Sequence, residues 1–145
     1  MAWSAWHELL RQEGGLSAKW YYRLDDADPW ALFGGFVDGP RQMLSVDRGP
    51  SGDVLAVGLS HPMQQDMYFD ETGALMEYTT VYRRPQGCGH NALLLQATLT
   101  YEAGTPKSYM FATVDGLAAD AATCGVEVAP PWLRVADLPK EVVGP

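Results

Sequence analysis

The chain has 145 residues, of which 47% are hydrophobic and 11% aromatic, and its formal net charge at neutral pH is −8. This length and composition predict one folded domain, residues 1–145, with a real hydrophobic core. The acidic balance argues against nucleic acid or an anionic membrane as a main partner, because no basic cluster is longer than the pair Arg83 and Arg84.

The sequence also carries signals about the cellular compartment. A membrane-spanning helix needs about 18 or more consecutive apolar residues, and no such run is present. The first residues lack the basic start and apolar middle of a signal peptide. Two cysteines, Cys88 and Cys124, are too few for a disulfide framework. We therefore expect a cytoplasmic protein with free thiols and no membrane association, and the alternative for the cysteines is a single bridge between them.

The N-terminal segment, residues 1–17, predicts a short helix and a lead-in to the first strand. Apolar residues recur within Trp3–Glu13 at the spacing of one helix face, and Gly14 marks its end. We interpret this helix as a lid over one end of the fold. The alternative is that Trp3 and Trp6 line a ligand entrance.

The rest of the chain predicts eight or nine short strands at hairpin spacing. The predicted strands are Ala18–Leu24, Trp30–Val37, Arg41–Arg48, Asp53–Ser60, Met67–Asp70, Ala74–Arg83, Asn91–Tyr101, Lys107–Val114 and Trp132–Leu138. A short late helix is expected within Asp115–Cys124, and residues 139–145 are expected to form a loose tail.

Alternation within the central strands indicates how they pack. One face of Asn91–Tyr101 is formed by Leu93, Leu95, Ala97, Leu99 and Tyr101. This face should lie against a core. Neither face of Ala74–Arg83 is purely apolar, which fits a barrel wall. We therefore predict a mainly β fold, an antiparallel β-barrel of eight or nine strands with a short N-terminal helix and a short late helix.

The order of these elements resembles the calycins, the group of lipocalins and their bacterial relatives. Trp20 stands at the first strand, where lipocalins carry Gly-x-Trp, although the glycine of that motif is absent. Arg134 in the last predicted strand corresponds to the arginine that packs on this tryptophan. The stretches Gly35–Pro40, and Asp70–Gly73 before a strand that ends at Val81–Arg84, also resemble lipocalin-like proteins of cyanobacteria of the bilin-lyase type. The resemblance implies a calycin-like barrel around a small ligand.

The function expected from such a barrel is binding of a small apolar or aromatic molecule, with catalysis of its isomerisation, cyclisation or attachment as by a lyase. The candidate catalytic residues are Tyr78, Tyr82 and Glu77. Because Glu77 and the tyrosines point to opposite faces of one strand, only one set can line the interior, and we favour the tyrosines. The candidate ligand-binding residues are Trp20, Tyr22, Trp30, Phe33, Met43, Met76, Thr80 and Met110, although aromatic residues and methionines also fill ordinary cores.

No other chemistry is indicated by a motif. No metal site and no cofactor are predicted, since His7, His61 and His90 are far apart in the sequence. Cys88 lies two residues before His90 in a glycine-rich turn, which suits either a reactive thiolate or simply a small turn residue, and we favour the turn residue.

The alternative function is a non-catalytic module that docks a protein partner or a second copy of itself, and we expect a monomer or a homodimer. An enclosed space of a few hundred Å³ would favour the small-molecule hypothesis. A filled core with an apolar outer patch would favour the interaction module. An α+β enzyme fold of the cystatin type would need a longer helix than Trp3–Glu13.

Overall fold

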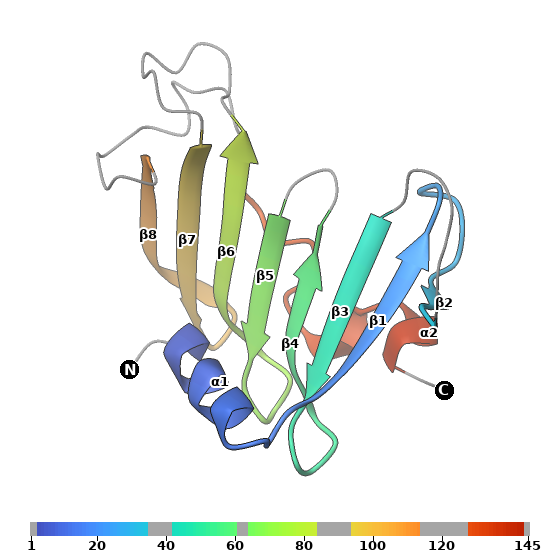
Figure 1. The fold of residues 1–145 in the computed structure, drawn as a ribbon. Coiled ribbons are helices and arrows are strands. Elements are labelled where there is room, and N and C mark those ends of the chain that lie inside the picture. Colours follow the sequence, from blue (N-terminus) through green and yellow to red (C-terminus); the bar gives the residue numbers. More distant parts are fainter. Residues whose placement is uncertain (1–2, 35–41, 61–63, 84–93, 114–127, 144–145) are drawn as a thin grey trace.

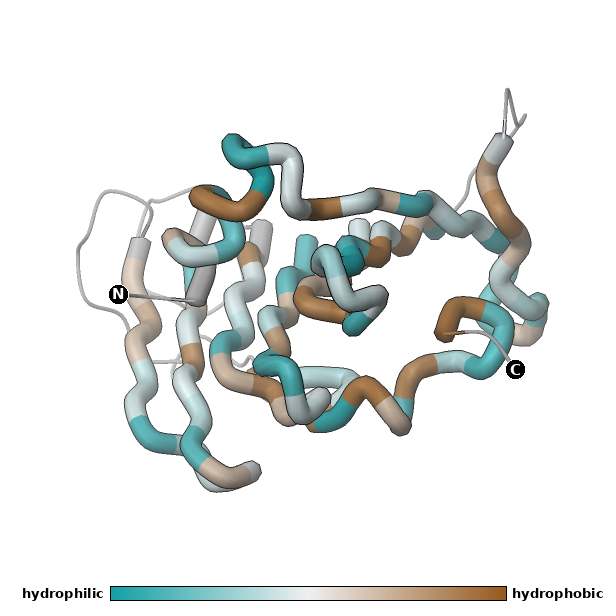
Figure 2. Tube along the Cα trace, turned by 90° about the horizontal axis from the view of Figure 1, so that it is seen from below, coloured by the Kyte–Doolittle hydropathy of each residue, from teal (hydrophilic) through white to brown (hydrophobic). Residues whose placement is uncertain are grey.

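The computed structural model describes residues 3–34, 42–60, 64–83, 94–113 and 128–143. These residues form one antiparallel sheet of eight strands, with a helix on one side and a C-terminal segment on the other (Figures 1 and 2). The elements in chain order are α1 (Trp3–Gln12), β1 (Ser17–Arg23), β2 (Ala31–Leu32), β3 (Gln42–Arg48), β4 (Val54–Leu59), β5 (Gln64–Phe69), β6 (Leu75–Arg83), β7 (Leu94–Glu102), β8 (Thr105–Thr113), a 3₁₀ helix (Val135–Asp137) and α2 (Lys140–Val143). The predicted mainly β fold with two short helices is confirmed.

The strands follow the order β2-β1-β3-β4-β5-β6-β7-β8, so almost every strand pairs with its neighbour in the sequence. Short turns close the β3–β4, β5–β6 and β7–β8 hairpins. In the turn between β5 and β6, the Asp70 carboxylate accepts hydrogen bonds from the backbone N–H and the hydroxyl of Thr72, at 2.9 and 2.6 Å. Gly73 follows with a φ of 85°, a conformation that favours glycine. Local chemistry of this kind explains why the strands were predictable.

The sheet is open. Its edges are β2 and β8, and no pairing among the described strands joins them (Figure 1). The closed barrel that we expected is therefore not formed by the described residues. A sheet closes only when its edge strands meet, and here one edge, β2, is only two residues long.

One face of the sheet carries the hydrophobic core, and we call it the core face. Its largest fully buried side chains are Tyr78, Phe69, Leu44, Met67, Leu75, Val46 and Val57. On β7, Ala97, Leu99 and Tyr101 are buried, as the alternation predicted. Because this core is filled and the sheet is open, the described residues do not form the barrel interior of a few hundred Å³ that would have favoured the small-molecule hypothesis, and a ligand site can lie only on the other face or at the ends of the sheet.

The C-terminal segment, residues 128–143, covers the core face and differs from both expectations for it. Trp132–Leu138 is not a strand: it makes one isolated bridge, between Arg134 and Ala74, and then a 3₁₀ helix. Residues 139–143 are not loose, because Leu138 and Val142 are buried against the core. Prolines near both ends interrupt β pairing, while apolar side chains four residues apart share one face of a helical turn. The predicted helix within Asp115–Cys124 lies outside the described residues.

The opposite face of the sheet, which we call the helix face, is partly covered by α1. The helix packs against β5 and β6, so it lies on a face of the sheet and not over the mouth of a barrel (Figure 1). The helix ends at Gln12, shortly before the predicted stop at Gly14, which has a φ of 73°, and the N–H of Gly15 donates to the carbonyl of Leu10 at 2.8 Å. None of the described helices combines the length and the apolar character needed to cross a membrane.

Candidate functional site

A small polar hollow lies between α1 and the helix face. It has a volume of about 70 Å³ and is lined by His7, Arg11, Ser45, Asp47, Ala56, Val57, Gly58, Asp66, Met67 and Tyr68. Larger depressions of about 360, 300 and 280 Å³ lie at the end of the sheet, but they are bordered mainly by turn residues such as Pro50, Ser51 and Thr72, which are exposed. We take the hollow under α1 as the candidate site, because among the depressions lined by described residues it is the one that holds the largely buried His7–Asp47 pair.

The roof of the hollow is held by an ion-pair cluster. The Nε2–H of His7 donates to the Asp47 carboxylate at 2.8 Å, and the Arg11 guanidinium lies 3.6 Å from the same carboxylate oxygen. His7 is only 5% exposed and makes an edge-on ring contact with Tyr68, with 5.3 Å between ring centroids. The cluster fixes the position of α1 on the sheet and leaves the Asp47 carboxylate occupied by two partners, the imidazole N–H of His7 and the guanidinium of Arg11.

The floor of the hollow is a glycine. A Cβ atom at Gly58 would lie 2.8 Å from the Ser45 hydroxyl oxygen and 3.2 Å from a carboxylate oxygen of Asp66. The φ of Gly58 is not in the left-handed region, so the backbone does not require glycine here. Instead, the glycine leaves room for these two oxygens, which come from the neighbouring strands β3 and β5.

Asp66 is the acidic group at one side of this space. Burial raises its pKa above the usual value, opposed by a hydrogen bond from the Gln64 amide at 3.2 Å and by the charge of His7. Among the described residues, no Lys, Arg or His side chain forms an ion pair with it. Asp66 is therefore a half-buried acid whose Oδ1 accepts from the Gln64 amide and also lies close to Gly58.

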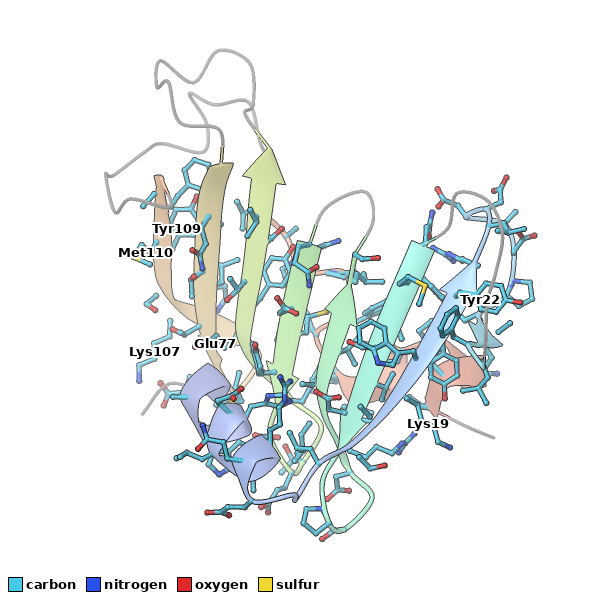
Figure 3. The ribbon with its side chains drawn as sticks, in the orientation of Figure 1. Lys19, Tyr22, Glu77, Lys107, Tyr109 and Met110 are labelled. Carbon is cyan, nitrogen blue, oxygen red and sulfur yellow. The ribbon has the colours of Figure 1, made fainter. Side chains whose placement is uncertain are left out.

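Tyr68 and Glu77 complete the acidic surroundings. Burial, followed by the negative charges of Asp66 and Glu77, raises the pKa of Tyr68 to about 12, so its phenol keeps its proton and can donate a hydrogen bond. Glu77 pairs with Tyr68 across the strands and is only 5% exposed, because α1 lies beside it (Figure 3).

An aromatic platform, formed by Trp20, Tyr22, Phe33 and Met43, continues the same face toward β2. Trp20 is 49% exposed. Tyr22 and Phe33 meet edge to face with centroids 6.1 Å apart, and Met43 pairs with Tyr22 across the strands. Trp20 pairs directly with Ser45, a lining residue of the hollow. The platform and the hollow are therefore adjacent parts of one surface.

The structure separates the predicted ligand-binding residues into three groups. Four of them, Trp20, Tyr22, Phe33 and Met43, form the platform. Trp30 and Thr80 are buried on the core side, where the Thr80 hydroxyl donates to the carbonyl of Gln64 at 3.0 Å. Met110 is 58% exposed on the edge strand β8, and Met76 is half-buried at a bulge in β6.

The predicted catalytic residues do not converge. Tyr78 is buried in the core, and its hydroxyl donates to the Gln65 side chain at 2.7 Å. Glu77 lies on the helix face, as alternation requires. We expected one of these two sets to line a barrel interior, but Tyr78 is packed in the core and Glu77 lies beside α1 on the opposite face. The side chain of Tyr82 lies outside the described residues, as do Cys88, Cys124, His61 and His90.

Sequence reasoning missed His7, Asp47, Asp66 and Tyr68 as members of a site. A signal for His7 was present, since it follows Trp6 and precedes Leu10 by three residues and thus shares the buried side of the helix. The meeting of Ser45, Gly58 and Asp66 depends on the register of three strands, which no local pattern encodes.

The part of the chain that the structure describes contains no group of three or more His, Cys, Asp or Glu side chains that could hold a metal ion. No family model matches the chain, and no curated protein and no solved structure matches it significantly. The candidate site therefore has to be interpreted from its own chemistry.

Proposed function

We propose that the protein binds a small molecule whose aromatic or apolar body lies on the platform and whose polar head enters the hollow. Trp20 offers an exposed aromatic face of the kind that stacks on flat apolar groups. Ser45, next to it in the sheet, begins the polar part of the surface. This surface joins an apolar anchor to a few convergent polar groups, which is the usual composition of a small-molecule site.

Gly58 is the observation that carries this proposal. A side chain is excluded at this position, because its Cβ would lie 2.8 Å from the Ser45 hydroxyl oxygen and 3.2 Å from Oδ1 of Asp66. The glycine therefore lets a hydroxyl and a carboxylate come close to the backbone of β4 at the floor of the hollow. Polar groups gathered in this way beside the platform supply the few convergent hydrogen-bonding groups of a small-molecule site, which favours a binding role.

Small probes should bind this surface weakly. A probe such as 2-phenylethanol has about nine non-hydrogen atoms, and at roughly 0.3–0.5 kcal/mol per atom its binding free energy is about −3 to −5 kcal/mol, a dissociation constant near the millimolar range. The natural ligand would gain affinity from a larger apolar body on the platform.

The test compares two glycine variants. Gly58→Ala places a methyl group 2.8 Å from the Ser45 hydroxyl oxygen, so it displaces the polar groups at the floor of the hollow and should weaken 2-phenylethanol binding at least tenfold, as measured by NMR titration. Gly34→Ala is the matched control, because a Cβ at Gly34 meets no atom of the described residues within 4 Å, and it should bind as the wild type does. Unchanged binding by Gly58→Ala would contradict the proposal.

Two finer proposals accompany this one. The first is that the fold is an open relative of the calycin barrel, which the sheet order and the N-terminal helix support. The His7–Asp47 pair is the group best placed to exchange a proton with a bound molecule, so we keep isomerisation or cyclisation of the ligand as a proposal for the chemistry.

A second candidate function is self-association through β8. On this edge strand, Tyr109 and Met110 are 51% and 58% exposed (Figure 3). Edge strands present backbone groups that can pair with a second copy. In a two-fold antiparallel pairing centred on Tyr109, Lys107 would lie opposite Phe111 and not opposite its own copy, which avoids repulsion between like charges.

A further inference from the structure

We infer that α1 is a movable lid over the hollow, which opens about Gly14 and Gly15 and is held closed by the contact between His7 and Asp47. Such a lid controls access to the hollow whatever molecule binds there, and it therefore goes beyond the proposed function. Three features of the molecule support it: the weak apolar packing of the helix, the carboxylates that it covers and the glycine pair at its end.

The helix is held on the sheet by little apolar packing. Among residues 5–12, whose side chains the structure describes, His7 is the one buried residue. Leu9 is 44% exposed, and Trp6 and Leu10 are only partly buried. Besides the polar hollow, a depression of about 300 Å³ remains between the helix and the β3–β4 turn. An element with so few buried apolar contacts belongs to the parts of a protein that open most readily.

His7 provides the best-buried polar contact between the helix and the sheet. Its Nε2–H donates to the Asp47 carboxylate at 2.8 Å, and its ring meets the Tyr68 ring edge-on. Arg11 also reaches Asp47, at 3.6 Å, but the arginine side chain is 59% exposed, so this ion pair contributes little. Loss of the His7 contact would therefore leave α1 with a water-exposed ion pair and partial apolar packing.

The carboxylates beneath the helix oppose its docking. Glu77 is 5% exposed where α1 lies beside β6, and burial raises the pKa of Asp66 at the edge of the hollow. Among the described residues, no Lys, Arg or His side chain forms an ion pair with either carboxylate. An ionised carboxylate loses hydration when the helix covers it, and opening returns water to both. This cost brings the docked and released positions of α1 closer in free energy.

The segment that joins α1 to β1 suits a hinge. Gly14 is exposed and has a φ of 73°, and a Cβ there would meet no atom of the described residues within 4 Å. Gly15 follows it, and β1 begins at Ser17. Because glycine accepts a wide range of backbone angles, a change at these two residues can swing the helix away while β1 stays in the sheet.

Opening of the lid has a direct readout in hydrogen exchange. A helix of ten residues is marginal in water without tertiary contacts, so α1 should lose its helical hydrogen bonds when it leaves the sheet. The backbone N–H groups of residues 7–12 then exchange with solvent. Exchange followed by NMR at low urea concentrations separates this local opening from global unfolding, since only global unfolding exposes enough surface for a steep dependence on urea.

In the wild type we expect the amides of residues 7–12 to exchange about a hundredfold or more faster than the central amides of β5 and β6, with little dependence on urea. Exchange of the β5 and β6 amides should rise steeply with urea. Equal rates with equal urea dependence in the helix and the strands would overturn the lid. This comparison needs no variant, so it tests the lid even where a substitution prevents folding.

Three variants test which groups control the lid. His7→Ala should accelerate exchange in α1 about tenfold or more, because it removes the buried contact to Asp47. Asp66→Asn should slow this exchange about twofold or more, because a neutral side chain is less costly to cover. Gln12→Ala is the matched control, since it removes an exposed polar side chain from the same helix and should leave exchange as in the wild type. Unchanged exchange in His7→Ala, or faster exchange in Asp66→Asn, would contradict the proposed control of the lid.

Discussion

Asp66 occupies a position where its negative charge is unfavourable for folding. Burial raises its pKa in the folded state above the usual value of 3.8. A raised folded pKa contributes stability below the unfolded pKa, and this contribution is lost as the pH rises through the folded pKa. At neutral pH the ionised Asp66 therefore makes the folded state less stable than a neutral side chain of the same shape would.

Asp66→Asn should accordingly stabilise the protein at pH 7, with a rise in Tm of about 1–3 °C. Thermal unfolding at pH 7 and pH 3 measures this effect. Near pH 3, below the usual pKa, the difference from the wild type should disappear because Asp66 is protonated in both states. A variant less stable than the wild type at pH 7 would show that the carboxylate supports the fold, and would argue against a binding role.

At the scale of elements, the C-terminal segment acts as part of the core. Leu138 is 3% exposed and Val142 is buried beside it, while the hydroxyl of Tyr21 on β1 donates to the carbonyl of Val142 at 3.4 Å. The segment also binds β2, since the N–H of Trp30 just before that strand donates to the Glu141 carboxylate at 3.0 Å. It therefore ties the first strands of the sheet to the end of the chain.

Leu138→Ala should lower the free energy of unfolding by about 2–4 kcal/mol, because it leaves a cavity between the segment and the sheet. Leu133→Ala is the matched control: Leu133 is 44% exposed in the same segment, and its loss should cost less than about 1 kcal/mol. Urea denaturation of both variants measures the difference. Equal losses would mean that the segment does not pack as the structure shows.

Prediction from the sequence succeeded for elements set by local chemistry. The strands could be placed because side chains alternate and turn residues such as Gly52 and Gly73 separate them. The C-terminal segment was mistaken for a strand and a tail, since its apolar residues find partners only through tertiary contacts. The aromatic residues of β1 could be named as ligand candidates from their residue type alone. Asp66 on β5 could not, because its surroundings depend on tertiary contacts.

At the scale of the whole molecule, the open sheet leaves one long edge strand, β8, with a single pairing partner among the described strands. If the second candidate function is correct, the wild type should change from a monomer of 15.9 kDa toward a dimer as concentration rises, and Met110→Lys should remain monomeric. Sedimentation equilibrium measures both masses. A wild type that stays monomeric at every concentration would eliminate self-association through β8.

The central claim is that the helix face around Trp20 binds an aromatic molecule, and the indole N–H signal of Trp20 in an NMR titration with 2-phenylethanol tests it most directly. The signal can be assigned by its loss in Trp20→Phe. The account predicts a saturable shift of the Trp20 signal at millimolar probe, with no shift for Trp30, which is buried in the core. A Trp20 signal that does not move, or a saturable shift of Trp30 in its place, would contradict it.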